Sequence, residues 1–208
     1  MTSPSSPAFG ADDDDVVVLV DPRDNVVGVA PKLDVHREGQ LHRAISVVLF
    51  DDRGHLLLQQ RAATKYHSGG LWSNTCCGHP RPGESVRDAA NRRLRDELGI
   101  TGCELVTACE FTYRADLGDG FVEHELDHVV IGRWRGEVVP NPAEVADTRW
   151  VERGRLLQSL AKTPRLYSAW TLDVVVWACW HMWRLDPEGP PTDHGGGAFR
   201  VDRARYTG

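Results

Sequence analysis

Short runs of apolar residues, separated by polar turn residues, dominate the first third of the chain. VVVLV at 16–20 and VVGVA at 26–30 flank the turn-rich pentapeptide DPRDN, and AISVVLF at 44–50 and LLLQQR at 56–61 flank DDRGH. Runs of β-branched and apolar residues bounded by Gly, Pro, Asn and Asp are typical of strands joined by tight turns. The pattern therefore predicts two β-hairpins.

The middle of the chain combines one helix with a third hairpin. The acidic-basic pattern SVRDAANRRLRDEL at 85–98 precedes Gly99, a residue that readily takes the left-handed conformation in which helices end. ELVTACEFTYRAD at 104–116 and FVEHELDHVVIGRW at 121–134 then flank LGDG, and TRWV at 148–151 is a further candidate strand. These segments predict a helix, a long hairpin and one more strand.

The last third of the chain has the pattern of helices. RLLQSLAK at 155–162 and RLYSAWTLDVVVWACWHMWRL at 165–185 predict two helices, the second with four tryptophans. Of these four, we expect Trp177, Trp180 and Trp183 to be core residues. Strands combined with a few helices, without regular βαβ alternation, indicate an α+β fold or an α/β/α sandwich.

Composition changes at both ends of the chain. Residues 1–15 are rich in Ser and Pro and end in four aspartates, and residues 186–208 are rich in Gly and Pro. Such segments bury too little apolar surface to offset the entropy of ordering them. We therefore expect a disordered N-terminal tail and a loosely held C-terminal tail around one domain at 16–185.

Charge and hydropathy narrow the functional class. The net charge of −6 argues against a broad nucleic-acid surface, and no apolar run approaches the ~18 residues of a membrane span. The start of the chain lacks the basic region of a secretory signal. We expect a cytoplasmic monomer or homodimer that binds neither nucleic acid nor membrane.

The chain has five cysteines, an odd number in a protein large enough to fold without disulfides, which favours reduced thiols. Two of them are adjacent in SNTCCGHPRPGES at 73–85, and His79 follows two positions after the second. Adjacent cysteines cannot easily bridge to each other. Taken alone, the stretch fits a disulfide position, a zinc knuckle or a catalytic thiol beside a metal ligand.

From Gly78 the chain resembles the Nudix signature G-x5-E-x7-R-E-U-x-E-E-x-G-U, in which U is aliphatic. The matching residues are Gly78, Glu84, Arg92, Leu94, Glu97, Gly99 and Ile100. Asp96 replaces one signature Glu, and Arg93 replaces the first Glu of the helix. A surface helix with charges on its wet face is the alternative. Because Arg93 removes a metal-binding carboxylate and adds a cation suited to phosphate oxygens, we expect a diphosphate-binding fold with a weakened hydrolytic cluster.

Three histidines and two glutamates are candidate metal ligands. Glu123 and Glu125 are two positions apart in a predicted strand, so both side chains face one side of it. On a core-facing surface they would repel each other unless a metal or a proton neutralised them, whereas an exposed strand face needs neither. His36, His42 and His79 are too scattered for a zinc finger. The residues alone therefore do not decide whether these five side chains form a metal site.

Several motifs together resemble the type I isopentenyl-diphosphate Δ-isomerases, across roughly 16–185. They are DVHREGQLHRA, RAATK, WSNTCCGHP, the modified helix GES…RRLRDELG, TYRAD and VEHE. The resemblance implies a Nudix-like α/β/α sandwich with a mixed β-sheet. It also implies an isomerase of isoprenoid biosynthesis that interconverts isopentenyl diphosphate and dimethylallyl diphosphate through a carbocation-like state.

Two metal sites follow from the resemblance. One divalent ion is expected on three histidines and two glutamates, which here are His36, His42, His79, Glu123 and Glu125. These N and O donors suit Mn²⁺, Mg²⁺ or Zn²⁺ and do not choose among them. A second ion, Mg²⁺, is expected to bridge the substrate diphosphate and Glu97, near the backbone of Cys77.

The resemblance also assigns residues around the substrate. The cations at the diphosphate correspond to Lys32, Arg61, Lys65 and Arg93. Cys77 and Glu125 are the implied acid and base, with Tyr113 either assisting Glu125 or simply a half-buried strand residue. Trp170 is expected to offer a π face to the developing cation, worth ~2 kcal/mol or more when desolvated. Trp72 is a second aromatic candidate.

Two other interpretations remain. A Nudix hydrolase of an organic or nucleoside diphosphate shares the helix, but it gives no role to Cys77 or the three histidines. A metal-stabilised binding module leaves Cys77 and the four cations without a role. In the isomerase interpretation Cys76 matches no catalytic position, and we expect it to be a small packed residue.

Overall fold

The computed structural model describes residues 16–65 and 67–185. At its centre, β3 (His42–Phe50) and β8 (Phe121–Arg133) run parallel, with His42 opposite Glu125 and Phe50 opposite Arg133. Both strands are buried over most of their length because apolar residues on each face pack against a layer of helix. A parallel pair within an otherwise antiparallel sheet confirms the expected mixed sheet.

The other strands of the described residues extend this central pair. They are β1 (Val16–Val20), β2 (Val26–Pro31), β4 (Leu56–Arg61), β5 (Trp72–Ser73), β6 (Cys76–Gly78), β7 (Leu105–Gly118) and β9 (Val145–Val151). The sheet order is β2-β1-β3-β4-β5, while β6 pairs with β3, β7 with β8 and β9 with β4. The three predicted hairpins and the late strand are confirmed; the short β5 and β6 were not predicted.

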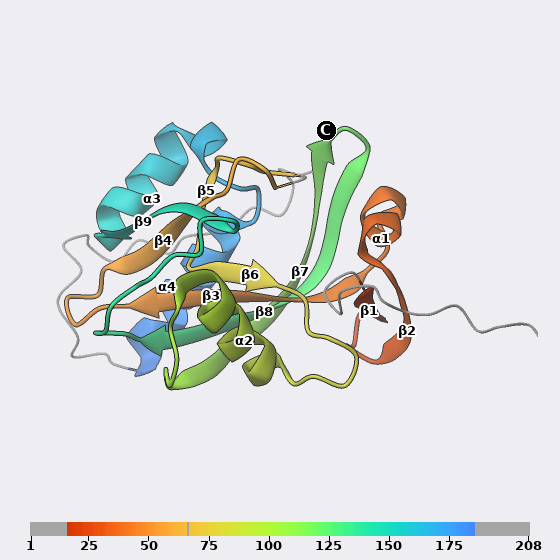
Figure 1. Ribbon diagram of the computed structural model, residues 1–208, viewed down its shortest axis with the longest axis horizontal. Coiled ribbons are helices and arrows are strands. Elements are labelled where there is room, and N and C mark those ends of the chain that lie inside the picture. The colour runs from red at the N-terminus through yellow and green to blue at the C-terminus, as the bar shows by residue number, and fades with distance from the viewer. Residues whose placement is uncertain (1–15, 66, 186–208) are drawn as a thin grey trace, which may run out of the picture.

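Helices cover both faces of the sheet (Figure 1). On one face, α2 (Val86–Leu98) begins at Ser85, whose Oγ accepts a hydrogen bond from the Asp88 amide, and ends at the left-handed Gly99. On the other, α4 (Thr171–Leu185) lies behind the sheet in the same view. Each helix packs on its own apolar core. The α/β/α sandwich and the helix at 85–98 are therefore confirmed.

A short helix that the hydrophobic pattern did not predict, α1 (Lys32–Glu38), follows β2. Among its apolar side chains only Val35 is buried, so it carries too little periodicity to stand out. Gly39 ends it with a φ of 64° in the left-handed region. Its position matters because it carries Lys32 and the buried His36.

The predicted helix at 155–162 is confirmed as α3 (Arg153–Lys162), but the next one starts later than predicted. Pro164–Leu166 form a single 3₁₀ turn, and the Ser168 amide then donates to the carbonyl of Trp72 at 2.9 Å. This extended contact with β5 delays the start of α4 until Thr171. Trp170 therefore precedes the helix and is not part of it.

The three tryptophans on α4 were wrongly predicted to be core residues. Trp177, Trp180 and Trp183 are 36%, 43% and 56% exposed. The buried face of α4 instead holds smaller residues, among them Val174 and Ala178, which let the helix approach the sheet closely. Within the described residues no helix is long and apolar enough to cross a membrane. The predicted tails, 1–15 and 186–208, lie outside the described residues.

Candidate active site

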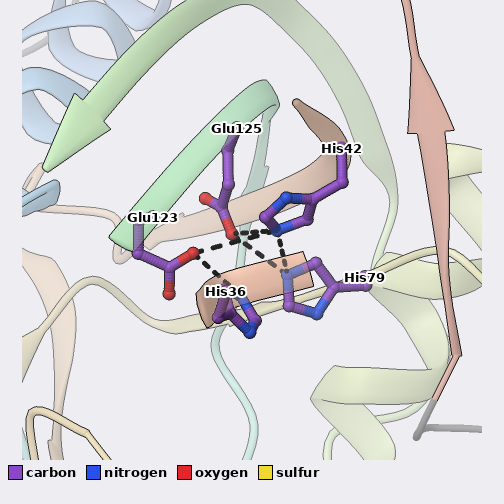
Figure 2. A group of neighbouring side chains, drawn as sticks. All are labelled: His36, His42, His79, Glu123 and Glu125. Atoms are coloured by element: carbon purple, nitrogen blue, oxygen red, sulfur yellow. Dashed lines mark hydrogen bonds and ion pairs between the residues drawn. The ribbon is translucent and has the colours of Figure 1, made fainter. Parts of the chain in front are cut away.

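The five predicted metal ligands converge from four segments of the chain (Figure 2). Glu123 and Glu125 project from the same face of β8, as the alternation of strand side chains requires. The parallel register places His42, the first residue of β3, directly opposite Glu125. His36 comes from α1, and His79 follows β6. The exposed-strand alternative is excluded, since Glu123 and Glu125 are only 3% and 8% exposed.

The separations of the donor atoms fit one divalent cation. Nε2 of His36 lies 3.0 Å from Oε2 of Glu123, and Nε2 of His79 lies 3.1 Å from Oε1 of Glu125. Nε2 of His42 lies 3.2 Å from Nε2 of His79 and 3.6 Å from Oε1 of Glu125. An ion about 2.1 Å from each ligand sets neighbouring octahedral donors about 3 Å apart. The cluster therefore has both the donor types and the spacing of a metal site.

Burial favours the neutral imidazoles that such a site needs, but it works against the ionised carboxylates. It lowers the pKa of His79 to about 3 and also lowers the pKa of His36, so both imidazoles are neutral and can act as ligands. Burial, reinforced by the charge of Glu125, raises the pKa of Glu123 well above its usual range. Burial also acts on Glu125, but hydrogen bonds from His42 and His79 outweigh it and lower its pKa. A bound cation would compensate the buried negative charge.

Tyr113 lies on β7 opposite Glu125, and its Oη donates a hydrogen bond of 2.5 Å to Oε2 of Glu125. Burial and the neighbouring Glu125 raise the pKa of the Tyr113 phenol well above its usual range. The phenol is therefore protonated. One oxygen of Glu125 faces the histidines while the other accepts from a phenol.

Cys77 lines the same cavity, surrounded by polar side chains. Its Sγ donates to Oδ1 of Asn74 at 3.2 Å and accepts from Nε1 of Trp170 at 3.2 Å, and Oγ of Ser46 lies 3.6 Å away. Burial raises the pKa of this thiol to about 12, so it is protonated at neutral pH. In contrast, Cys76 is fully buried, as predicted for a small packed residue. All five cysteines are free.

The four predicted cations lie on the wall of this cavity, whose volume is about 170 Å³. They are Lys32, Arg61, Lys65 and Arg93. Burial, followed by repulsion from Arg93 and Lys65, lowers the pKa of Lys32. Glu144 forms ion pairs with both Lys65 and Arg93. Four cations in one small cavity favour an anionic ligand with several oxygen atoms.

The modified helix α2 turns one side toward this cavity. Glu97 accepts hydrogen bonds from Nε of Arg93 at 2.8 Å and from Nε2 of Gln59 at 3.0 Å, and both Arg93 and Glu97 line the cavity. Asp96 is paired with Arg95 on the exposed side of the helix. The replacement at Arg93 therefore acts inside the cavity, while the replacement at Asp96 does not.

The two aromatic candidates differ. Trp170 is buried, lines the cavity, and has the guanidinium of Arg61 5.5 Å from its ring centroid. Trp72 stacks against Arg149, whose guanidinium lies 3.6 Å from its ring centroid. Trp72 is not among the described residues that line the cavity. Trp170 is therefore the better placed of the two.

Several residues of the site were missed in the sequence. His67 lies 3.2 Å from Oε1 of Glu123 and packs edge-on against Trp170, and Glu144 holds two of the cations. Asn74 and Ser46 contact the thiol. Asn74 lies within the motif WSNTCCGHP and His67 lies two residues after RAATK, which is a weak signal for each. Glu144 and Ser46 lie in segments with no chemical pattern, and no signal could have found them.

A second group of possible metal ligands lies elsewhere on β8. His128 has its Nε2 3.3 Å from Oδ2 of Asp24 and its Nδ1 3.8 Å from Glu110. The two carboxylates therefore approach different nitrogens of one ring. Arg43 already neutralises Asp24 at 2.7 Å, and the side chain of Glu110 is 61% exposed. This group therefore offers three donors, one of them on an exposed side chain, whereas the first cluster offers five.

Comparison with known families identifies the class of protein. A family model described as the NUDIX domain matches residues 40–171. DR0079 from Deinococcus radiodurans superposes with a TM-score of 0.66 at 18% identity, over 78% of this chain and 98% of that chain. A MutT NUDIX hydrolase from Burkholderia pseudomallei gives a TM-score of 0.52 at 21% identity, over 66% and 98% of the two chains. The protein has the NUDIX fold.

Relatives at higher identity give the narrower family. A protein of Aromatoleum aromaticum named isopentenyl-diphosphate Delta-isomerase 2 is 54% identical over 157 residues, 76% of this chain and 82% of its own. An isopentenyl-diphosphate Delta-isomerase of Nocardia farcinica is 50% identical over 161 residues, 76% and 91% of the two chains. The chain belongs to the isopentenyl-diphosphate Delta-isomerase family.

Proposed function

We propose that this protein interconverts isopentenyl diphosphate and dimethylallyl diphosphate. The observation that carries the proposal is a single cavity lined by Cys77, Tyr113 and Glu125 together with four cations. The family membership supports the same reaction. Cytoplasmic location and a monomeric or homodimeric state stay predictions.

The basic wall of the cavity binds the diphosphate in this proposal. The contacts come from Lys32, Arg61, Lys65 and Arg93. Glu97 lies among them and would hold a Mg²⁺ ion that is bound to the diphosphate. Arg93 already pairs with Glu97 and Glu144. When the diphosphate binds, Arg93 would therefore exchange these carboxylate partners for phosphate oxygens.

The reaction adds one proton to the terminal methylene of the alkene and removes one from the methylene on the other side of the branched carbon. The composition of the substrate is unchanged, so the site needs a proton donor and a proton acceptor and no attacking water. Cys77 and Glu125 are the proposed pair. Tyr113, hydrogen bonded to Glu125, would help to move the proton at that carboxyl.

The five-ligand cluster would hold one divalent ion, Mn²⁺, Mg²⁺ or Zn²⁺. When bound, the ion supplies positive charge that fixes Glu125 in place and tunes its acidity. Trp170 closes the site beside the thiol and offers its ring to the positive charge that develops on the branched carbon.

Turnover in D₂O tests the function directly. The protein is incubated with isopentenyl diphosphate, Mg²⁺ and Mn²⁺, and the products are followed by ¹H, ²H and ³¹P NMR. The proposal expects dimethylallyl diphosphate with deuterium in a methyl group. Release of phosphate without isomerised product would instead indicate a Nudix hydrolase, and an unchanged substrate would indicate a binding module.

A further inference from the structure

A buried carboxyl group beside the thiol has no part in the mechanism above. Asp127 lies on β8 two residues beyond Glu125, so both side chains project from the same face of the strand. Asp127 is fully buried, and its Oδ1 has no hydrogen-bond partner among the described residues. Its Oδ2 accepts a 2.7 Å hydrogen bond from Oγ of Ser46. A buried carboxyl group with one partner needs a reason to be there.

Ser46 connects this carboxyl group to Cys77. It lies opposite Cys77 in the pairing of β3 with β6, and its Oγ is 3.6 Å from the sulfur. A serine hydroxyl has a single hydrogen. While Asp127 accepts that hydrogen, Ser46 can only accept from the thiol and cannot donate to the sulfur.

Asn74, like Ser46, is held by its other hydrogen bonds so that it presents an acceptor to the thiol. Its Nδ2 donates to the carbonyls of Val47 and Cys76, each at 3.0 Å, which fixes its Oδ1 toward the sulfur. The thiol hydrogen therefore has two acceptors near it. The sulfur itself receives a hydrogen bond from the indole of Trp170.

We propose that Asp127, acting through Ser46, is a positioning residue for Cys77. It keeps the Ser46 hydrogen away from the sulfur, so Ser46 and Asn74 act as two fixed acceptors that set the direction of the S–H bond. Without Asp127, Ser46 is free to rotate and donate to the sulfur. The proposal rests on the proposed function, since it assumes that Cys77 exchanges a proton with the substrate.

Three variants test this role by steady-state kinetics with isopentenyl diphosphate. Ser46→Ala and Asp127→Leu each remove one link, and we expect kcat to fall about 10- to 100-fold with KM unchanged, as for a misplaced reacting group. Asp127→Asn keeps an oxygen that can accept from Ser46, so it should retain kcat within about threefold. Thr75→Val is the matched control: it removes a buried hydroxyl that bonds the backbone at Leu49 and Leu57.

A vibrational measurement tests the same role without turnover. The S–H stretching band of Cys77, isolated by subtracting the infrared spectrum of Cys77→Ala, should shift in Ser46→Ala and stay in place in Asp127→Asn. If wild-type protein forms no dimethylallyl diphosphate, the proposed function fails while this band still reports on positioning.

Three results would overturn the positioning role. They are full kcat in Ser46→Ala, a change confined to KM, and an Asp127→Asn variant as slow as Asp127→Leu, which would make Asp127 a proton carrier. Circular dichroism checks the fold of each variant. Should Asp127→Leu not fold, Ser46→Ala decides alone, because alanine fits the space of serine.

Discussion

Cys76 and Cys77 are neighbours in the chain but belong to two different regions of the molecule. Cys76 lies opposite Val47 of β3 and packs in the core under α2, with residues such as Ala90 and Leu94. Cys77 lies opposite Ser46 and lines the cavity on the other side of the strand. Adjacent strand residues point to opposite faces, so one doublet serves two regions.

The difference shows that the surroundings, and not the thiol, decide what a cysteine can do. Around Cys76, burial raises the pKa of the sulfur well above its usual range and the neighbours are apolar. Around Cys77, an amide oxygen, a hydroxyl and an indole N–H all lie within 3.6 Å. Only the second region can direct a proton.

Cys77→Ala should give the largest effect that separates the two regions. Loss of the proposed proton-transfer group is expected to lower kcat for isopentenyl diphosphate by about 10³-fold or more, because positioned acid-base groups contribute on that scale. Circular dichroism and metal content should be unchanged. If the variant kept its turnover, the thiol would have no role in the reaction.

His79→Ala extends the comparison to the next residue on the Cys77 side. The loss of one of five ligands should weaken binding of Mn²⁺ by at least about 100-fold, measured by isothermal titration calorimetry, since even outer-shell changes cost 10- to 100-fold. His128→Ala is the matched control on the second group, which has three candidate ligands instead of five. Equal losses in the two variants would contradict the assignment of the metal site.

The raised pKa of Cys77 predicts a third, smaller effect, which is a dependence of stability and of thiol alkylation on pH. A raised folded-state pKa means that the unfolded thiol, with a pKa near 8.5, releases its proton first. Cys77 therefore contributes stability that is complete below about pH 8.5 and is lost as the pH rises toward about 12.

At pH 8.5 iodoacetamide should then modify Cys77 at least about 10-fold more slowly in native protein than in urea-unfolded protein. Peptide mapping by mass spectrometry gives the rate at each cysteine. Equal rates in the two states would mean that Cys77 is a reactive thiolate and that burial does not control it.

Cys76→Ala should give the smallest effect on activity. The small cavity left under α2 is expected to lower the free energy of unfolding by about 1 kcal/mol, measured by urea denaturation. The kcat should stay within about twofold of wild type. Inactivation as complete as that of Cys77→Ala would mean that the two cysteines had been assigned the wrong roles.

Local periodicity was enough to predict most of the fold. The hairpins, the helix ending at Gly99 and the same-face pair Glu123 and Glu125 all depend on short-range spacing, which the sequence displays directly. The exposed face of α4 was predicted wrongly because the orientation of a helix depends on which side fits the sheet. The small residues Val174 and Ala178 pack against the sheet, and the larger tryptophans lie on the other side of the helix.

The candidate site was less accessible to sequence reasoning alone. Physical arguments gave Glu123 and Glu125 as a pair but left their exposure open. The three histidines were candidates from the residues alone, and only the resemblance assigned them as ligands. Their convergence depends on the pairing of β3 with β8, about 80 residues apart, which no local pattern encodes. Ser46 and Asp127 meet through the same pairing.

The parallel register of β3 and β8 makes this site sensitive to insertions and deletions rather than to most substitutions. One residue added to β8 between Glu125 and Arg133 would move Glu123 and Glu125 out of line with His42, or force the apolar residues beyond them onto the wrong faces. Length change here would therefore damage the core and the metal ligands together. Length variation among functional variants of this protein should be confined to its turns, such as the one at 119–120 between β7 and β8.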